Sequence, residues 1–391
     1  MDVLLVTFLF SLLPISSLKT FPSFLISSSL QSISSALCNT IFFFSSTEAE
    51  ISSKIGVNYG QLGNNLPSPR RSIELLTSMN AGRVKLYDAN PEILNLLSET
   101  KFQVSIMVPN NEISRIASNQ SMADEWVRHN VVPYYPKTLI RFLLVGNEVL
   151  SDYSVQGQKI WLDLVPAMRR IQRSLQSQNI TKIKVSTPIA MDVLETTFPV
   201  SAGTFRSSVR DTVMVPMLEF LNKTNSFLFI DAYTYFPWSS NPTNISLDFA
   251  LLRGNFNITD PFSSLSYTNL LDQMLDSVIF AMSKLGFPSI RLVISETGWP
   301  HSGNIVDQAA AAAGANIFNA AMYNQNLIKK ITANPPLGTP ARPGVVIPTF
   351  IFSLYDENMK KGPGIERHWG LLHPDGTPMY EDFAPLSINA V

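Results

Sequence analysis

The feature that most constrains this chain is an apolar, strand-like run that stops on a carboxylate. Residues 291–300 read RLVISETGWP, and the Leu, Val and Ile at 292–294 are typical of a strand buried on both faces. The glycine and proline that follow Glu296 cannot continue such a strand, because glycine weakens it and proline lacks a donor for the ladder. Glu296 is therefore predicted to lie at the C-terminal end of a buried strand.

A second run follows the same plan. Residues 140–145 (IRFLLV) are mainly apolar and are followed by Gly146, Asn147 and Glu148. In a barrel of parallel strands, the C-terminal strand ends surround one mouth, where enzymes of this architecture keep their active sites. If both strands belong to such a barrel, Glu148 and Glu296 face each other across that mouth.

Strand-like and helix-like segments alternate from residue 54 onward, as is typical of a parallel sheet covered by helices. Two early helices carry start signals, with Ser68 before Pro69 and Asn90 before Pro91. Helices are also expected at 161–176, 270–285 and 309–330. The pattern predicts eight strands, near 55–59, 84–87, 104–108, 140–148, 183–187, 227–235, 292–296 and 347–355.

The fold class expected from this alternation is α/β, a (β/α)8 TIM barrel in a single domain of residues 54–391. Eight parallel strands close into a barrel without an exposed edge. An open, doubly wound sheet is the competing fold. The glycine-rich phosphate loop that usually follows its first strand is missing from this sequence.

The composition excludes several classes of function. The net charge is −1, so no overall field attracts nucleic acid or an anionic membrane, and a neutral partner is expected. The one cysteine, Cys38, lies in the N-terminal region, so no disulfide or thiolate chemistry is expected in the rest of the chain. None of the four histidines has the spacing of a zinc motif. We therefore expect neither a metal nor a cofactor.

Residues 1–53 differ from the rest of the chain. Residues 3–13 form an apolar run suited to a signal peptide, and a serine-rich stretch follows. We expect this leader to be removed or disordered, and the protein to be secreted to the extracellular space or cell wall. No later run reaches the roughly 20 apolar residues of a membrane helix, so we expect no stable membrane anchor. We also expect the protein to be a monomer. Five Asn-X-Ser/Thr sequons are consistent with secretion: Asn119, Asn179, Asn222, Asn244 and Asn257.

A pair of carboxyl groups across a barrel mouth suits glycoside hydrolysis. One group protonates the leaving oxygen, and at a separation of roughly 5 to 5.5 Å the second attacks the anomeric carbon, with retention of configuration. Asn147 can offer an amide to a sugar hydroxyl beside the reacting carbon, so Glu148 is predicted to be the acid/base. Glu296, with hydroxyl side chains on both sides, is predicted to stay ionised and to act as the nucleophile.

Aromatic residues at strand ends can stack on sugar faces. Tyr59, Tyr233 and Trp299 each lie at or just past the C-terminal end of a predicted strand and are expected to form subsite walls, with core packing as the alternative for each.

Several motifs together resemble the plant β-1,3-glucanases of glycoside hydrolase family 17, particularly their anther-expressed branch. These motifs are VNYGQLGNNLPSP (57–69), VKLYDANP (84–91), VGNEV (145–149), ISETGWP (294–300) and FSLYDENMK (352–360). The resemblance covers residues 55–380. It implies a retaining (β/α)8 endo-hydrolase of (1→3)-β-D-glucosidic linkages in β-1,3-glucans such as callose.

Carried over to this sequence, the resemblance makes Glu148 the proton donor and Glu296 the nucleophile. It adds Glu357, Lys360 and Glu366, a charged group that supports the substrate cleft. Two rivals use the same scaffold, a β-1,3-1,4-glucanase and a transglycosylase. A third is a protein that binds wall glucan without cutting it, although such a binder has no reason to retain both glutamates.

Overall fold

The computed structural model describes residues 55–254, 256–303 and 314–380. These residues lie in one compact unit, Ser52–Val391. The prediction for a removable leader at 1–53 falls outside the described residues. No helix among the described residues is long and apolar enough to cross a membrane.

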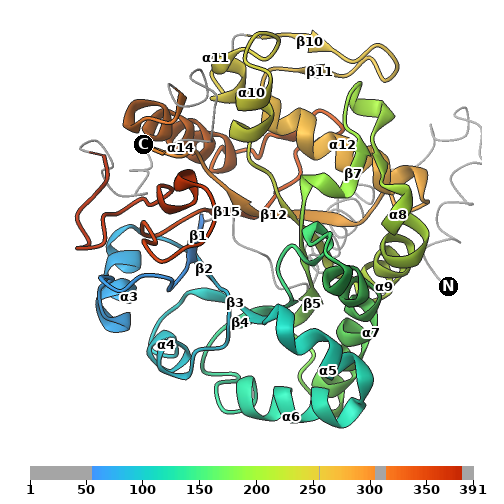
Figure 1. The fold of residues 1–391 in the computed structure, drawn as a ribbon, viewed down its shortest axis with the longest axis vertical. Coiled ribbons are helices and arrows are strands. Elements are labelled where there is room, and N and C mark those ends of the chain that lie inside the picture. Colours follow the sequence, from blue (N-terminus) through green and yellow to red (C-terminus); the bar gives the residue numbers. More distant parts are fainter. Residues whose placement is uncertain (1–54, 255, 304–313, 381–391) are drawn as a thin grey trace, which may run out of the picture. The chain divides into compact units, whose positions relative to one another are not determined.

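The centre of the fold is a parallel sheet that closes on itself (Figure 1). Its strands run in the order β5-β4-β3-β2-β1-β15-β12-β9-β6. The two end strands, β5 and β6, are separated in the chain by Thr187 alone, while β5 pairs with β4 and β6 pairs with β9. Together they fill one position of the barrel, so the eight predicted strand positions and the (β/α)8 fold are confirmed. The strands are β1 (Gly56–Tyr59), β2 (Arg83–Leu86), β3 (Gln103–Val108), β4 (Ile140–Val145), β5 (Lys184–Ser186), β6 (Pro188–Ala190), β9 (Phe227–Asp231), β12 (Arg291–Thr297) and β15 (Thr349–Ile351).

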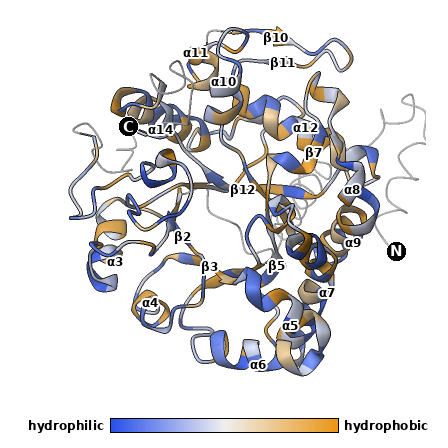
Figure 2. Ribbon diagram, in the orientation of Figure 1, coloured by the Kyte–Doolittle hydropathy of each residue, from blue (hydrophilic) through white to orange (hydrophobic). Residues whose placement is uncertain are grey.

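Helices surround the barrel (Figure 1). Two begin where the sequence signals predicted, because Ser68 Oγ accepts a hydrogen bond from the backbone of Arg71, and the side chain of Asn90 accepts one from the backbone of Ile93. In Figure 2 the outer helices carry both hydrophobic and hydrophilic residues, as amphipathic helices do. The longer ones are α3 (Pro69–Ser78), α4 (Pro91–Leu97), α5 (Ile113–Ser118), α6 (Gln120–Asn130), α7 (Val155–Ser177), α9 (Val215–Lys223), α12 (Leu270–Lys284) and α14 (Ile317–Ile331).

Shorter elements connect these units. The 3-10 and π segments are η2 (Asn110–Glu112), η3 (Val149–Ser151), η4 (Met191–Val193), η5 (Val200–Ala202), η6 (Arg210–Met214) and η7 (Gly364–Arg367). The short α-helices are α8 (Ser207–Val209), α10 (Tyr235–Ser240) and α11 (Leu247–Ala250). Within the described ranges, three antiparallel strand pairs lie outside the barrel sheet: β7 (Leu194–Thr196) with β8 (Thr204–Phe205), β10 (Ile258–Thr259) with β11 (Ser266–Tyr267), and β13 (Gly338–Thr339) with β14 (Arg342–Pro343).

Some strands are shorter than the sequence suggested. The predicted strand at 227–235 ends at Asp231, and Tyr235 already begins helix α10. The fifth position is broken before Pro188, because proline cannot donate to the ladder.

Strand alternation sorts the side chains into two layers. On β1, Val57 and Tyr59 belong to the apolar core cluster shared with the helices, so Asn58 between them faces the barrel interior. Its amide donates to the backbone oxygen of Ser295, 3.3 Å away. By the same alternation Lys85 on β2 faces inward between Val84 and Leu86, which both join the outer core.

The barrel interior changes character along its axis. Phe142, Phe227 and Phe229 fill it towards the N-terminal ends of their strands, with ring centroids 5.5 and 4.8 Å from that of Phe142. Asp231 follows on the same face of β9, two residues beyond Phe229. The C-terminal mouth is therefore lined by polar and charged side chains, and a layer of phenylalanine rings fills the barrel below them.

Candidate active site

A cavity of about 420 Å3 opens at the C-terminal ends of the barrel strands. It is lined by side chains on β6, β9 and β12, in the segments that follow β2, β4 and β15, and on helices α10 and α12. Glu148 and Glu296 both line it, so the structure brings the two predicted carboxyl groups into one cavity. The lining residues are Tyr87, Asn147, Glu148, Ala190, Met191, Asp192, Asp231, Tyr233, Phe236, Pro237, Met274, Glu296, Phe352, Lys360, Glu366 and Trp369.

Glu296 is held by three donors. Its Oε1 accepts hydrogen bonds from Lys85 Nζ at 2.7 Å and Tyr87 Oη at 2.6 Å. Its Oε2 accepts one from Tyr233 Oη at 2.7 Å. The hydroxyl of the neighbouring Thr297 points elsewhere and donates to the backbone oxygen of Ala232.

These contacts determine the ionisation of Glu296. Burial alone would raise the pKa of this carboxyl, which is only 5% exposed. The charge of Lys85 and the hydrogen bonds from Lys85 and Tyr87 outweigh burial, so the pKa of Glu296 lies below its ordinary value. Glu296 is therefore a carboxylate at neutral pH.

The pKa of Glu148 is shifted in the opposite direction from that of Glu296. Glu148 follows β4 in the left-handed backbone region, with φ at 47°, and its backbone N–H donates to the oxygen of Pro188 on β6. Its carboxyl group makes no hydrogen bond to another described residue. Burial and the negative charge of Glu296 raise the pKa of Glu148 to about 7, although the charge of Lys85 partly opposes this. Glu148 therefore carries a proton over much of the range below neutral pH.

Asn147 is fixed by a reciprocal contact with Asn110. The side chain of Asn110 accepts from the backbone N–H of Asn147 at 2.7 Å and donates to its backbone oxygen at 2.9 Å. The side-chain Oδ1 of Asn147 is buried without a hydrogen-bond partner in the described chain. Its amide group is thus available to a ligand in the cavity.

The charged group at the end of β15 lies beside the cavity. Lys360 and Glu366 line it, whereas Glu357 does not and accepts a hydrogen bond from the backbone of Leu62 at 2.9 Å. Lys360 Nζ lies 4.0 Å from Glu357 Oε2, and it also lies over the ring of Phe352. A Cβ atom at position 60 would clash with the carboxyl group of Glu357, so glycine is the residue that fits there.

The three predicted aromatic walls have different positions. Tyr233 lines the cavity, and its ring packs against that of Trp369 with centroids 5.0 Å apart. Tyr59 and Trp299 do not line it. Tyr59 is 2% exposed and faces the helix layer, where it packs against Tyr355. Trp299 is fully buried, and its Nε1 donates to the backbone oxygen of Gly314.

Sequence reasoning missed several members of the site. Lys85 and Tyr87 lie in the motif VKLYDANP (84–91), which had indicated only the resemblance to the family. The signal for Lys85 was a cation inside an otherwise apolar buried strand, which requires an anionic partner. Asp231, at the end of β9, also lines the cavity. Both its oxygens are buried without a hydrogen bond of normal geometry, and burial and the charge of Glu296 hold its pKa well above the ordinary value.

The comparisons with known proteins agree with this geometry. The family model described as glycosyl hydrolases family 17 matches residues 55–383. The chain belongs to glycosyl hydrolase family 17. The resemblance inferred from the five motifs is confirmed.

Relatives within this family are similar over most of the chain. A probable glucan endo-1,3-β-glucosidase A6 of Arabidopsis thaliana is 58% identical over 335 residues, which cover 86% of this chain and 68% of that protein. The solved structure of CJP38, a β-1,3-glucanase and allergen of Cryptomeria japonica pollen, superposes with a TM-score of 0.79 at 40% identity, covering 86% of this chain and all of that one. A structure from a study of two plant β-glucan endohydrolases with distinct substrate specificities has a TM-score of 0.74 at 33% identity, covering 83% of this chain and 98% of that one.

The raised pKa of Glu148 makes the stability of this glycosyl hydrolase depend on pH. A carboxyl group that binds its proton more tightly when folded loses stabilising free energy as pH rises from its ordinary pKa of 4.5 to its folded pKa of about 7. Glu148→Gln removes this titration. Relative to wild type, the stability of the variant should therefore increase as pH rises through this range, by on the order of 3 kcal/mol in total. Denaturant unfolding at a series of pH values measures the difference, and a difference independent of pH would contradict the shift.

Proposed function

We propose that this chain is a retaining endo-1,3-β-glucanase in which Glu148 is the acid/base and Glu296 the nucleophile. The observation that carries the proposal is the opposite perturbation of two glutamates in one cavity. The pKa of Glu296 is lowered, and that of Glu148 is raised to about 7. A pair of carboxyl groups whose environments separate their pKa values in this way supplies one acid and one anion at the same pH.

In the first step, Glu296 attacks the anomeric carbon while the glycosidic C–O bond breaks. Glu148 gives its proton to the departing oxygen, so the aglycone part of the glucan leaves as an alcohol. Oε1 of Glu296 already accepts two hydrogen bonds and Oε2 only one. We assign the attack to Oε2, which keeps more of its electron density free.

In the second step, water attacks the glycosyl-enzyme. Glu148, now a carboxylate, takes a proton from that water, and the bond between the sugar and Glu296 breaks. The anomeric carbon is inverted twice, so its configuration is retained. Asn147, Tyr233, Lys360 and Glu366 line the same cavity and are proposed to bind the sugar, and Glu357 to position Lys360.

Action within a chain, rather than at its end, is supported by the shape of the site. A second cavity of about 590 Å3 shares Met191, Pro237 and Met274 with the first. A polymer can therefore extend beyond the reacting sugar. The names of the relatives favour β-1,3-linked glucan, such as callose, over the mixed-linkage and transglycosylase alternatives.

The proposed location is the extracellular space or cell wall, with the protein secreted as a monomeric glycoprotein. The asparagines of all five sequons are exposed, so each can accept a glycan without unfolding. The leader-like composition of residues 1–53 supports the same route.

Chemical rescue tests the two roles separately. Glu148→Ala should lose hydrolysis of laminarin but still form the glycosyl-enzyme from an activated aryl β-glucoside, because a good leaving group needs no proton. Azide should then release a β-glycosyl azide. Glu296→Ala lacks the nucleophile, so azide in the vacated space should give the α-product from an activated donor. NMR of the products distinguishes the two, and exchanged stereochemistry would show that the roles are reversed.

Substrate comparison tests the linkage. Wild-type protein should release reducing ends from laminarin, a β-1,3-glucan, at least about tenfold faster than from lichenan, a mixed-linkage glucan. Early products should be oligosaccharides of several lengths, as internal cleavage requires. Equal rates on both glucans would favour the mixed-linkage alternative. When a short β-1,3-linked oligosaccharide is the substrate, products longer than that oligosaccharide would favour a transglycosylase.

A further inference from the structure

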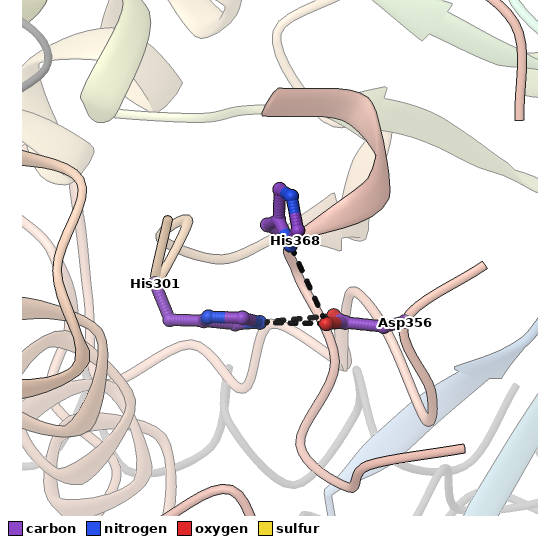
Figure 3. Close-up of side chains that lie close together, drawn as sticks. All are labelled: His301, Asp356 and His368. Atoms are coloured by element: carbon purple, nitrogen blue, oxygen red, sulfur yellow. Dashed lines mark hydrogen bonds and ion pairs between the residues drawn. The ribbon is translucent and has the colours of Figure 1, made fainter. Parts of the chain in front are cut away.

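Two histidines and an aspartate meet outside the catalytic cavity. Figure 3 shows His301 and His368 both directed at the carboxyl group of Asp356. His301 Nε2 lies 3.0 Å from each of the two Asp356 oxygens, and His368 Nδ1 lies 3.5 Å from Oδ2. One ligating atom from each of the three residues lies within 4.8 Å of the others. None of the three residues lines the catalytic cavity.

The three residues come from separate parts of the chain. His301 follows β12, Asp356 follows β15, and His368 directly follows η7. The backbone N–H of His301 donates to the backbone oxygen of His368 at 2.9 Å, so the two histidine segments are fixed to each other. The backbone N–H of Gly370 donates to Asp356 Oδ1 at 2.8 Å and orients the carboxyl group.

This donor set has the chemistry of a transition-metal site. Two imidazoles and a carboxylate are ligands of zinc, at roughly 2.0 to 2.2 Å from the ion, and three protein ligands leave a position for water. In a tetrahedral site the ligand atoms lie roughly 3.3 Å apart. The two His–Asp distances of 3.0 and 3.5 Å match that spacing. The hydrogen bond from Gly370 to Asp356 is the kind of outer contact that orients a metal ligand.

Two further observations favour an ion over a purely hydrogen-bonded cluster. His368 Nδ1 is buried and makes no hydrogen bond within the described chain, although it faces the carboxylate. A ligated ion would satisfy this atom. The side chain of His368 is 37% exposed, whereas that of Asp356 is 15% exposed, so the cluster is open to solvent on the His368 side. An ion and its water ligand can enter there.

We propose that His301, Asp356 and His368 form a binding site for one zinc ion. The ion would connect the segments that follow β12, β15 and η7. Those segments also carry part of the catalytic cavity, since Trp369 lines it directly after His368 and Phe352 lines it directly after β15. Bound zinc would therefore stabilise one wall of the cavity without contacting the substrate.

The test uses the full-length secreted protein, freed of metal with a chelator and dialysed at pH 7.5. Calorimetric titration with zinc chloride should show one ion bound per chain, and Tm should rise on addition of zinc. Cobalt chloride should give the visible absorption of a four-coordinate cobalt site. His301→Gln and His368→Gln should each weaken zinc binding by at least about tenfold and remove most of the Tm rise.

Matched controls use the two other histidines. His129 and His373 are exposed and lie outside the cluster, so His129→Gln and His373→Gln should bind zinc as wild type does. Because the side chain of His368 is half-exposed, His368→Gln should fold normally. Without metal, its Tm should equal that of metal-free wild type. Absence of stoichiometric zinc binding by wild type, or wild-type affinity in His368→Gln, would overturn the proposal and leave a hydrogen-bonded His–Asp–His cluster. Glucanase activity is not the readout, so this result is independent of the function proposed above.

Discussion

The ion pair between Lys85 and Glu296 determines the electrostatics of the whole barrel mouth. Both side chains are almost fully buried, and their charged atoms are 2.7 Å apart. Removing two charges from water is costly, and such a pair is tolerated only where geometry is good and the remaining lone pairs are satisfied. Tyr87 and Tyr233 supply those contacts to Glu296. Burial and the charge of this carboxylate raise the pKa of Glu148 and of Asp231, so the ionised Glu296 favours the protonated form of both neighbours.

The barrel explains why these groups meet. Every second residue of a strand faces the interior, and all the strands end at the same mouth, so polar residues placed last on the inward face converge there. Asp231 and Glu296 line one cavity in this way, and Lys85 on a third strand contacts Glu296. The same alternation places other strand-end residues on the outward face of the barrel. Tyr59 ends its strand on the outward face, so its ring packs among helices, while Asn58 faces the interior and donates to the backbone of Ser295.

Much of this could be predicted from the sequence. The alternation of strand-like and helix-like segments predicted the barrel. The two glutamates that follow apolar runs predicted the pair of carboxyl groups that lines the cavity. The remaining errors have physical causes. A residue that follows a strand can face either layer, and one residue of register decides between them, which is why Tyr59 and Trp299 were misplaced. The partners of Glu296 and the His–Asp–His cluster bring together residues from distant parts of the chain. No spacing within one segment reveals such a cluster.

In the proposed mechanism, Glu296 forms a covalent bond to the sugar. The direct test is to incubate the protein with a 2-deoxy-2-fluoro-β-laminaribiosyl fluoride, digest it and sequence the modified peptide by mass spectrometry. The fluorine at C2 slows both steps and the fluoride leaving group needs no acid, so the glycosyl-enzyme accumulates. We predict that the label is on Glu296, in the peptide that contains ISETGWP. A label on Glu148, or turnover with no labelled intermediate and an inverted product, would contradict the account.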